Sequence, residues 1–291
     1  MRIFPSLLAL ALLALPQALP QAKAAPLHTL WTVKGKTNTV YLLGSVHFLS
    51  PDEKLPAVID DAYRDAEKLL MEIDMDDLDP QAVQQLTVDL GLLPSNETLE
   101  SQLGAQNYAQ VVKQARAVGM DPALLGRLRP WLAALTLVQM NLKEMGLDAD
   151  SGVEQKLMAR AAADGKEIRG LETIQQQLGM LAGLPLQQQR EFLLYSVEDM
   201  ERAKGEIDAL IGAWRKGDTK ALSTLLTEGL DEYPDLYRPL TLDRNRQWLQ
   251  SIENLLDDRD DYLVVVGALH LVGKGSVIDL LQQHGHKATQ Q

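Results

Sequence analysis

Two histidines follow the same short pattern near opposite ends of this sequence. In YLLGSVHFLS, His47 stands three residues after Gly44, and in YLVVVGALHLVG, His270 stands three residues after Gly267. Each motif ends an apolar run of the kind that forms a buried strand. Glycine lets the chain turn sharply where a strand ends, so both imidazoles are expected at the edge of a sheet. Imidazole binds metal ions and transfers protons near neutral pH, so the doubled motif predicts one shared functional site.

Two carboxylates are expected at the same edge. The segments KLLMEID and KEIRGLE are further candidate strands, and they place Glu72 and Glu172 near their carboxyl ends. In an open parallel sheet, ligands bind in the crevice beyond the carboxyl ends of the strands. There, His47, His270 and Glu72 would form a nitrogen and oxygen donor set suited to Zn²⁺, Mn²⁺ or Co²⁺.

Other polar residues are weaker candidates. Ser45 lies inside the first motif, but Ala268 holds the matching place in the second, which argues against a serine nucleophile. A single histidine at a strand end is more often a hydrogen-bonded structural residue, and only the doubling of the motif favours a site. The remaining histidines are expected at the surface: His28, His284 and His286.

A group of polar side chains opens the segment RNRQWLQSI. Arg244, Asn245 and Arg246 precede an apolar helical stripe that includes Trp248. The periodicity favours solvated surface arginines, and the alternative is that one guanidinium reaches the site and binds a carboxylate or a developing oxyanion. The glutamines of IQQQLGMLAGLPLQQQREF are likewise interpreted as solvated helix faces.

A sheet must position these candidates, and the residue pattern predicts one. Two strands with a turn at Gly35 are expected in HTLWTVKGKTNTVYLLGS, then a helix in PAVIDDAYRDAEK and a strand in KLLMEIDM. A strand, helix and strand within about 35 residues is typical of a parallel βαβ unit. Near the end of the chain, a buried strand, a helix and an edge strand are expected in DDYLVVVGALHL, KGSVIDLLQQHG and HKATQ.

Most of the chain between these strands is predicted to be helical. Asp79 and Pro80 form a good helix start. Amphipathic segments are expected at 106–118, 122–145, 151–163, 186–215, 218–228 and 236–256, interrupted by the strand at 166–172. The predicted fold class is therefore α/β. A mixed central sheet from two related halves carries paired Gly-x-x-His strand ends and a helical insertion around 80–260, within one domain at 25–291.

The amino terminus has the pattern of a secretory signal peptide. A basic start at Arg2, an apolar core and the small residues of AKA predict cleavage after Ala24, so that residues 1–24 are removed. Prolines interrupt the apolar run before it reaches the about 20 residues that a transmembrane helix needs. The protein is therefore expected to be periplasmic or secreted, with no stable membrane span after cleavage.

Composition argues against several other classes. The chain has no cysteine, which removes disulfides, thiolate metal sites and cysteine nucleophiles together. Its net charge of −12, without a basic tract, argues against nucleic acid, whose phosphates need clustered lysine and arginine. The expected partner is a peptide or small-molecule substrate, and an acidic chain suits a bound cation.

The motifs together resemble the TraB/PrgY/GumN family, which is related to the Tiki metalloproteases and more distantly to erythromycin-esterase-like and ChaN-like proteins. The resemblance covers nearly all of the chain after residue 24. It rests on LLGSVHFL, LLMEID, RPWLAAL, GVEQKLMARAAADGKEIRGLETIQQQL, RNRQWLQSI and VVVGALHLVGKGSVIDLL. Carried over by position, it implies four site residues: His47, His270, Glu72 and Arg244, with Asn245 beside the arginine.

One position departs from the family pattern. Glu154, in GVEQKL, stands where members often have aspartate, so a carboxylate is kept at a longer reach. Glu172, in GLET, is a second carboxylate whose role the resemblance leaves open.

The resemblance and the donor set imply an exported metal-dependent hydrolase, with a peptide bond as the expected target. His47, His270 and Glu72 would hold a divalent ion (Mn²⁺, Co²⁺ or Zn²⁺), Glu72 being a ligand or the general base. Arg244 would stabilise the oxyanion. Two alternatives stay open: a non-catalytic periplasmic protein that binds haem or metal in the same crevice, and a metal-independent esterase-like hydrolase with a histidine base.

Overall fold

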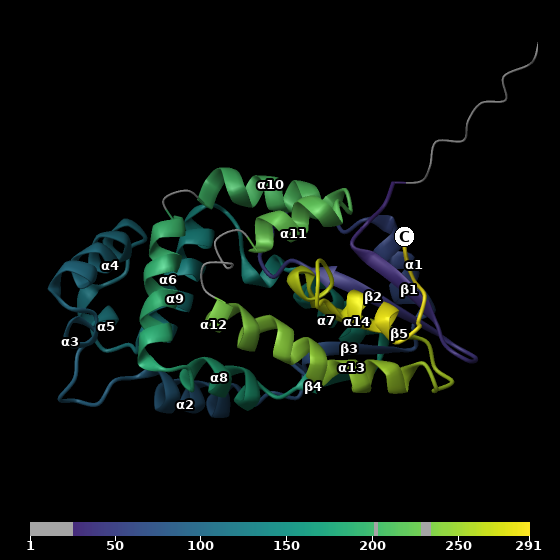
Figure 1. Ribbon diagram of the computed structural model, residues 1–291, viewed down its shortest axis with the longest axis horizontal. Coiled ribbons are helices and arrows are strands. Elements are labelled where there is room, and N and C mark those ends of the chain that lie inside the picture. Colours follow the sequence, from purple (N-terminus) through teal and green to yellow (C-terminus); the bar gives the residue numbers. More distant parts are fainter. Residues whose placement is uncertain (1–25, 201–202, 228–233) are drawn as a thin grey trace, which may run out of the picture.

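Six strands form one mixed sheet in the order β4-β3-β5-β2-β1-β6 (Figure 1). The computed structural model describes residues 26–200, 203–227 and 234–291, and the predicted signal peptide at 1–24 lies outside them. The strands are β1 (Leu30–Lys34), β2 (Thr39–Ser45), β3 (Lys68–Ile73), β4 (Ile168–Glu172), β5 (Tyr262–Gly267) and β6 (Ala288–Gln290). The predicted α/β class with a mixed sheet is confirmed.

Four neighbouring strands run parallel. β2, β5, β3 and β4 pair in this way, whereas β1 pairs antiparallel with both β2 and β6. β5 comes from the carboxyl-terminal part of the chain but lies between β2 and β3. The two Gly-x-x-His strands are therefore direct neighbours, and their register places Gly44 beside Val266 and Ser45 beside Gly267.

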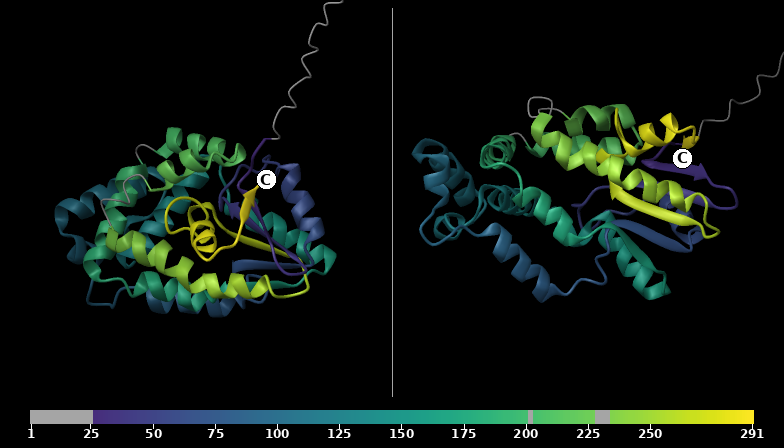
Figure 2. Two further views of the ribbon diagram at one scale, coloured as in Figure 1. Left: turned by 45° about the vertical axis from the view of Figure 1, so that its right-hand side comes forward. Right: turned by 60° about the horizontal axis from the view of Figure 1, so that its bottom comes forward.

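Helices cover both faces of this sheet. Helices α13 (Asp243–Leu255) and α14 (Val277–Gln283) lie in front of it, and α1 (Ala57–Asp65) and α7 (Val153–Asp164) lie behind it (Figures 1 and 2). All six residues of β5 are buried, as a parallel strand covered on both sides requires. Because helices cover both faces of β5, its residues are apolar throughout and do not alternate between apolar and polar.

The other helices belong to the long segment between β3 and β5. They are α2 (Pro80–Gly91), α3 (Leu99–Leu103), α4 (Ala105–Ala117), α5 (Pro122–Leu125), α6 (Pro130–Glu144), α8 (Ile174–Ala182), α9 (Leu186–Met200), α10 (Ala203–Arg215), α11 (Thr219–Thr227) and α12 (Pro234–Tyr237). Short 3₁₀ helices lie at η1 (Ala149–Ser151) and η4 (Ala268–His270), and η3 (Arg238–Leu242) is a π-helical segment that joins α12 directly to α13. None of the helices within the described ranges has the length and apolar content to cross a membrane.

The helices farthest from the sheet form their own apolar cluster, in which Leu99, Val111, Leu137 and Leu193 are fully buried. Here the prediction of one continuous helix at 122–145 is wrong. The chain divides into α5 and α6 because Arg129 is extended and Pro130, which has no N–H to donate, begins α6.

Two close contacts fix the backbone around the first motif. The backbone N–H of Val153, at the start of α7, donates to the carbonyl of Val46 at 3.1 Å. The buried indole of Trp214, on α10, donates to the carbonyl of Gly44 at 2.7 Å. Next to Val153, a β-carbon on Gly152 would lie only 2.2 Å from the carbonyl oxygen of His47. The first histidine is thus held by its backbone as well as by its side chain.

We predict that Gly152→Ala lowers the free energy of unfolding by about 1–3 kcal/mol, because the new β-carbon meets a backbone carbonyl rather than a movable side chain. Gly152 has a φ of −59°, which alanine adopts easily, so the effect is steric. Urea unfolding measures it.

Gly179→Ala, in α8, is the matched control for this prediction. Nothing lies within 4 Å of a β-carbon there, so alanine should stabilise the helix by up to about 1 kcal/mol. Equal stability of the Gly152→Ala protein and the unmodified protein would contradict the close approach at His47.

Candidate active site

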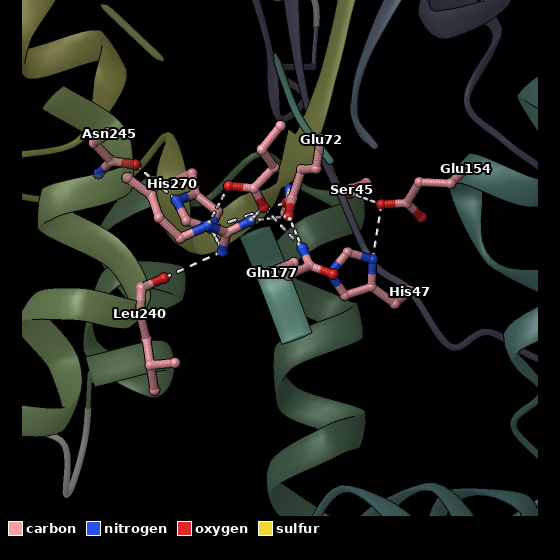
Figure 3. Close-up of polar contacts among 11 residues, drawn as sticks. Ser45, His47, Glu72, Glu154, Gln177, Leu240, Asn245 and His270 are labelled. Carbon is pink, nitrogen blue, oxygen red and sulfur yellow. Dashed lines mark hydrogen bonds and ion pairs between the residues drawn. The ribbon is translucent and has the colours of Figure 1, made fainter. Parts of the chain in front are cut away.

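Three of the predicted site residues meet at the carboxyl ends of the parallel strands. His47 follows β2, Glu72 belongs to β3, and His270 lies on η4 directly after β5 (Figure 3). A β-carbon on Gly267 would lie 3.3 Å from Nε2 of His47 and 3.4 Å from Oε1 of Glu72. It would also lie 3.7 Å from Cδ2 of His270. The absence of a side chain at Gly267 therefore leaves the space in which these groups converge.

Glu72 is held at the centre of this group. Its Oε1 accepts a hydrogen bond from the backbone N–H of Gly267 at 2.8 Å and lies 3.9 Å from Nε2 of His270. Burial disfavours the ionised form, but His270, Arg244, His47 and the Gly267 N–H together outweigh it and hold the pKa of Glu72 at about 2. Glu72 is therefore a carboxylate throughout the physiological range.

Arg244, at the start of α13, is the fourth predicted site residue, and it is buried with only 8% of its surface exposed. Its Nη2 lies 2.5 Å from both Oε2 of Glu72 and Oε1 of Glu172, and its Nε donates to Oε2 of Glu172 at 3.2 Å. Its Nη1 lies 3.2 Å from the carbonyl oxygen of Leu240 and 3.1 Å from Nε2 of His270. Each of the five N–H groups of the guanidinium thus has its own acceptor atom, two of them on Glu172.

The interpretation of these arginines as solvated is therefore wrong for Arg244, whose charge is neutralised inside the protein by two carboxylates. The guanidinium also lies 4.5 Å from the ring of Trp248, within the range of a cation–π contact. Arg246, two residues further on, is exposed and pairs with Asp243, as the periodicity predicts.

His270 is fixed through both ring nitrogens. Its Nδ1 lies 2.6 Å from Oδ1 of Asn245, whose amide nitrogen donates to the carbonyl of Gly275 at 2.9 Å. A guanidinium only donates, so Nε2 of His270 must accept from Arg244, and Nδ1 carries the proton. Burial lowers the pKa of His270 to about 4, so the ring is neutral near pH 7, in agreement with this tautomer.

Within the described part of the chain, His47 is fixed through one ring nitrogen only. Its Nδ1 lies 2.8 Å from Oε1 of Glu154, on the first turn of α7, and the same oxygen accepts the hydroxyl of Ser45 (Figure 3). The side chain of His47 is 57% exposed, and the charge of Glu154 raises its pKa to about 9. Burial opposes ionisation of Glu154, but His47 and the Ser45 hydroxyl lower its pKa. The other ring nitrogen of His47, Nε2, faces Gly267 and Glu72.

A pocket of about 190 Å³ opens beside His47 and Glu72. Its lining combines these polar groups with an apolar wall that contains three methionines. The lining residues are His47, Met71, Glu72, Ile73, Met75, Ala149, Glu154, Gln155, Met158 and Gln177. Ligand pockets commonly pair a mostly apolar lining with a few polar groups, and this pocket has that character.

Gln177, on α8, is a site residue that the sequence reasoning missed. Its amide donates to Oε2 of Glu72 at 3.2 Å and to Oε1 of Glu172 at 3.1 Å. The interpretation of these glutamines as solvated is wrong for Gln177, and also for Gln189, which is buried and donates to two carbonyls. The available signal was its place in the chain. Gln177 is the fourth residue of α8, and α8 follows directly after β4, which ends at Glu172.

The other histidines do not reach the site. His284 and His286 both lie beside Oε1 of Glu253, at 2.9 Å and 3.1 Å. His284 is exposed as predicted, whereas His286 and His28 are half-buried.

The donor chemistry of the site fits a divalent ion. Nε2 of His270 and Oε1 of Glu72 are 3.9 Å apart, which two ligands about 2.0–2.2 Å from one ion can span. Each imidazole is held at Nδ1, by Glu154 or Asn245, as outer partners of metal-binding histidines typically do.

One contact opposes a metal ion at this site. In the described residues, no three imidazole or carboxylate groups are already placed closely enough to hold an ion. Arg244 takes the lone pair of Nε2 on His270 and contacts Glu72. An ion bound through His270 therefore requires the guanidinium to leave that nitrogen.

Comparison with known proteins identifies the family. The model of the TraB/PrgY/gumN family matches residues 29–290. The chain belongs to this family. It is 24% identical over 256 residues to the uncharacterized protein YbaP of Escherichia coli (strain K12), covering 83% of this chain and 87% of that protein, and YbaP of Shigella flexneri gives the same values. An uncharacterized protein of Treponema pallidum (strain Nichols) is 25% identical over 283 residues, covering 91% and 83%. No solved structure matches the chain.

We predict that the ring of His47 titrates with a pKa of about 9 in EDTA-treated protein, and that Glu154→Gln lowers this pKa toward 6.5. Because the folded-state pKa exceeds the ordinary value, the ion pair stabilises the fold fully below pH 6.5, and this contribution is lost as the pH rises through about 9. An NMR pH titration of the ring carbons measures it.

Glu253→Gln is the control for this titration, since it removes a carboxylate beside His284 and His286 and should leave His47 unchanged. A His47 pKa that is the same in the Glu154→Gln protein would show that Glu154 does not hold the proton.

Proposed function

We propose that this protein is an exported metal-dependent hydrolase that cleaves amide bonds, with peptides as its substrate class. One arrangement supports the proposal above all others. Two histidines that follow β2 and β5 and a carboxylate of β3 converge on Gly267, and each imidazole is held by another side chain at Nδ1. Export enters the proposal through the leader sequence at 1–24.

In this proposal His47, His270 and Glu72 hold the divalent ion, which is Mn²⁺, Co²⁺ or Zn²⁺. Such an ion supplies Lewis-acid polarisation of the scissile carbonyl and activation of the attacking water. Of the two roles expected for Glu72, the low pKa favours the ligand, because a carboxylate with a pKa of about 2 is a weak proton acceptor near neutral pH.

The surrounding side chains keep these groups in place. Glu154 and Asn245 fix the two imidazole rings, and the amide of Gln177 holds the carboxylates of Glu72 and Glu172 together. Groups of this kind set the orientation of ligands, and their loss typically weakens metal affinity or activity by about 10–100-fold.

The pocket supports an apolar group next to the bond that is cleaved. Met71, Met75 and Met158 form much of its wall, and methionine adapts its shape to irregular apolar groups. The volume of about 190 Å³ is below the about 300–1,000 Å³ of pockets that enclose drug-sized ligands. It suits one side chain of an extended peptide better than a haem macrocycle.

The metal-independent alternative has less support from the same residues. The hydroxyl of Ser45 donates to Glu154 instead of facing an imidazole base. His47 must lose the proton on Nε2 to act as a base, as it must to bind an ion, and a divalent ion drives this loss whereas a neutral ester does not.

We predict that EDTA-stripped protein takes up about one Mn²⁺, Co²⁺ or Zn²⁺ per chain. His47→Ala and His270→Ala should each lose the ion and lower peptide hydrolysis by roughly 100-fold or more, because each removes a ligand rather than an outer partner. Elemental analysis by ICP-MS after desalting gives the ion content, and a quenched-fluorescence peptide library with apolar side chains gives the rate.

His284→Ala is the control, since that ring pairs with Glu253 outside the site. Circular dichroism establishes that each variant is folded. A folded His47→Ala/His270→Ala protein with full ion content and full activity would overturn the assignment. Hydrolysis that persists in EDTA would identify the metal-independent hydrolase instead, and a bound ion without hydrolysis would identify a metal-binding protein.

A further inference from the structure

Arg244 contacts the two groups that a metal ion at this site would need. Its Nη2 lies 2.5 Å from Oε2 of Glu72, and its Nη1 lies 3.1 Å from Nε2 of His270. The neutral imidazole has a single lone pair, at Nε2, which cannot serve an N–H group and a metal ion together. Contact with Arg244 and coordination of an ion are therefore mutually exclusive at His270.

The other contacts of Arg244 do not involve the proposed ligands. Nε and Nη2 donate to the two carboxylate oxygens of Glu172, which has a side chain only 9% exposed. The ring of Trp248 lies 4.5 Å from the guanidinium carbon. A guanidinium that gave up Glu72 and His270 would still be held by Glu172 and Trp248.

We propose that Arg244 occupies Glu72 and His270 when no ion is bound, and that a divalent ion displaces its guanidinium from both residues. The inference rests on the metal-dependent function proposed above. All five N–H groups of Arg244 are engaged in this structure, so none is available for a substrate oxygen. The exchange releases one N–H of Nη1 and one of Nη2. The same movement therefore opens the metal site and provides the donor expected to stabilise an oxyanion.

This exchange has a measurable consequence for affinity. Arg244 both occupies the ligands and repels a second cation at close range. Its removal leaves Glu72 and Glu172 beside His270 without the guanidinium that they share. A divalent ion should therefore bind more tightly when Arg244 is absent, whereas an arginine that merely positions the ligands would give the opposite result.

The test is the affinity of EDTA-stripped protein for Mn²⁺ and Zn²⁺, measured by isothermal titration calorimetry. Arg244→Gln should lower the Kd at least about tenfold, because a full positive charge and a competing donor are removed together. Arg246→Gln is the matched control, since it removes the same charge from the exposed face of the same helix, and it should leave the Kd unchanged. His270→Ala should abolish tight binding both in the unmodified protein and in the Arg244→Gln protein. The measured heat then comes from an ion bound at this site.

A second variant covers the case in which Arg244→Gln does not fold. Arg244→Lys keeps the charge, but its three donors sit on one nitrogen and cannot reproduce the four hydrogen bonds that the planar guanidinium makes to Glu72, Glu172 and His270. It should also bind the ion more tightly than the unmodified protein, by a smaller factor.

The outcomes separate the two proposals. Equal or weaker binding by the folded Arg244 variants, with binding by the unmodified protein, overturns the exchange and leaves the metal-dependent function standing. Tighter binding by Arg246→Gln to the same degree also overturns the exchange, because the effect would then be one of overall charge. An ion that binds neither the unmodified protein nor the Arg244 variants overturns both proposals.

Discussion

The site depends on the repulsion between two largely buried carboxylates, Glu72 and Glu172, which lie at the ends of neighbouring strands. β3 and β4 run parallel with Ile73 paired to Glu172, so Glu72 and Glu172 end at the same edge. Buried like charges this close repel each other, and each also loses its hydration. Arg244 meets an oxygen of each carboxylate, and the Gln177 amide bridges them. The helices that carry these two side chains, α13 and α8, are thereby tied to the strand ends.

The strand order does the rest of the positioning. Because β5 lies between β2 and β3, the segments that follow β2 and β5 leave the sheet side by side, and Glu72 of β3 lies next to them. Gly267 has no side chain at the point where these groups meet. The two imidazoles are then oriented from opposite faces of the sheet, His47 by Glu154 of α7 and His270 by Asn245 of α13. Helices from both faces of the sheet and strands from both ends of the chain therefore contribute to the site.

The sequence predicts the parts of this structure that local patterns encode. Apolar runs locate the strands, and the repeated Gly-x-x-His pattern locates both histidines. It does not predict that β5 inserts between β2 and β3, since strand order depends on long-range packing and not on the residues of one segment. The break between α5 and α6 was readable from Pro130, but the amphipathic pattern on both sides concealed it.

The burial of Arg244 was missed for a different reason. Arg244 stands four residues before Trp248, and Trp248 stands four before Ile252, so all three lie on one face of α13. That face packs on the sheet, and Arg246 points away from it. The pattern was present in the sequence, but a charge on an apolar face becomes intelligible only when its partners are known. Those partners, Glu72 and Glu172, come from strands far away in the chain.

The charges of the assembled site limit its chemistry. The carboxylates of Glu72, Glu154 and Glu172 face two cationic side chains, Arg244 and His47, whose pKa of about 9 keeps it protonated near neutral pH. His270 is neutral, so these groups carry one negative charge in excess. That excess attracts a cation and repels a phosphate or sulfate group. A neutral carbonyl, as in an amide, carries no such penalty. The charges of the described residues therefore favour a bound cation, and a divalent ion, by reversing the sign of this excess, would then attract an electron-rich oxygen such as that of the proposed amide.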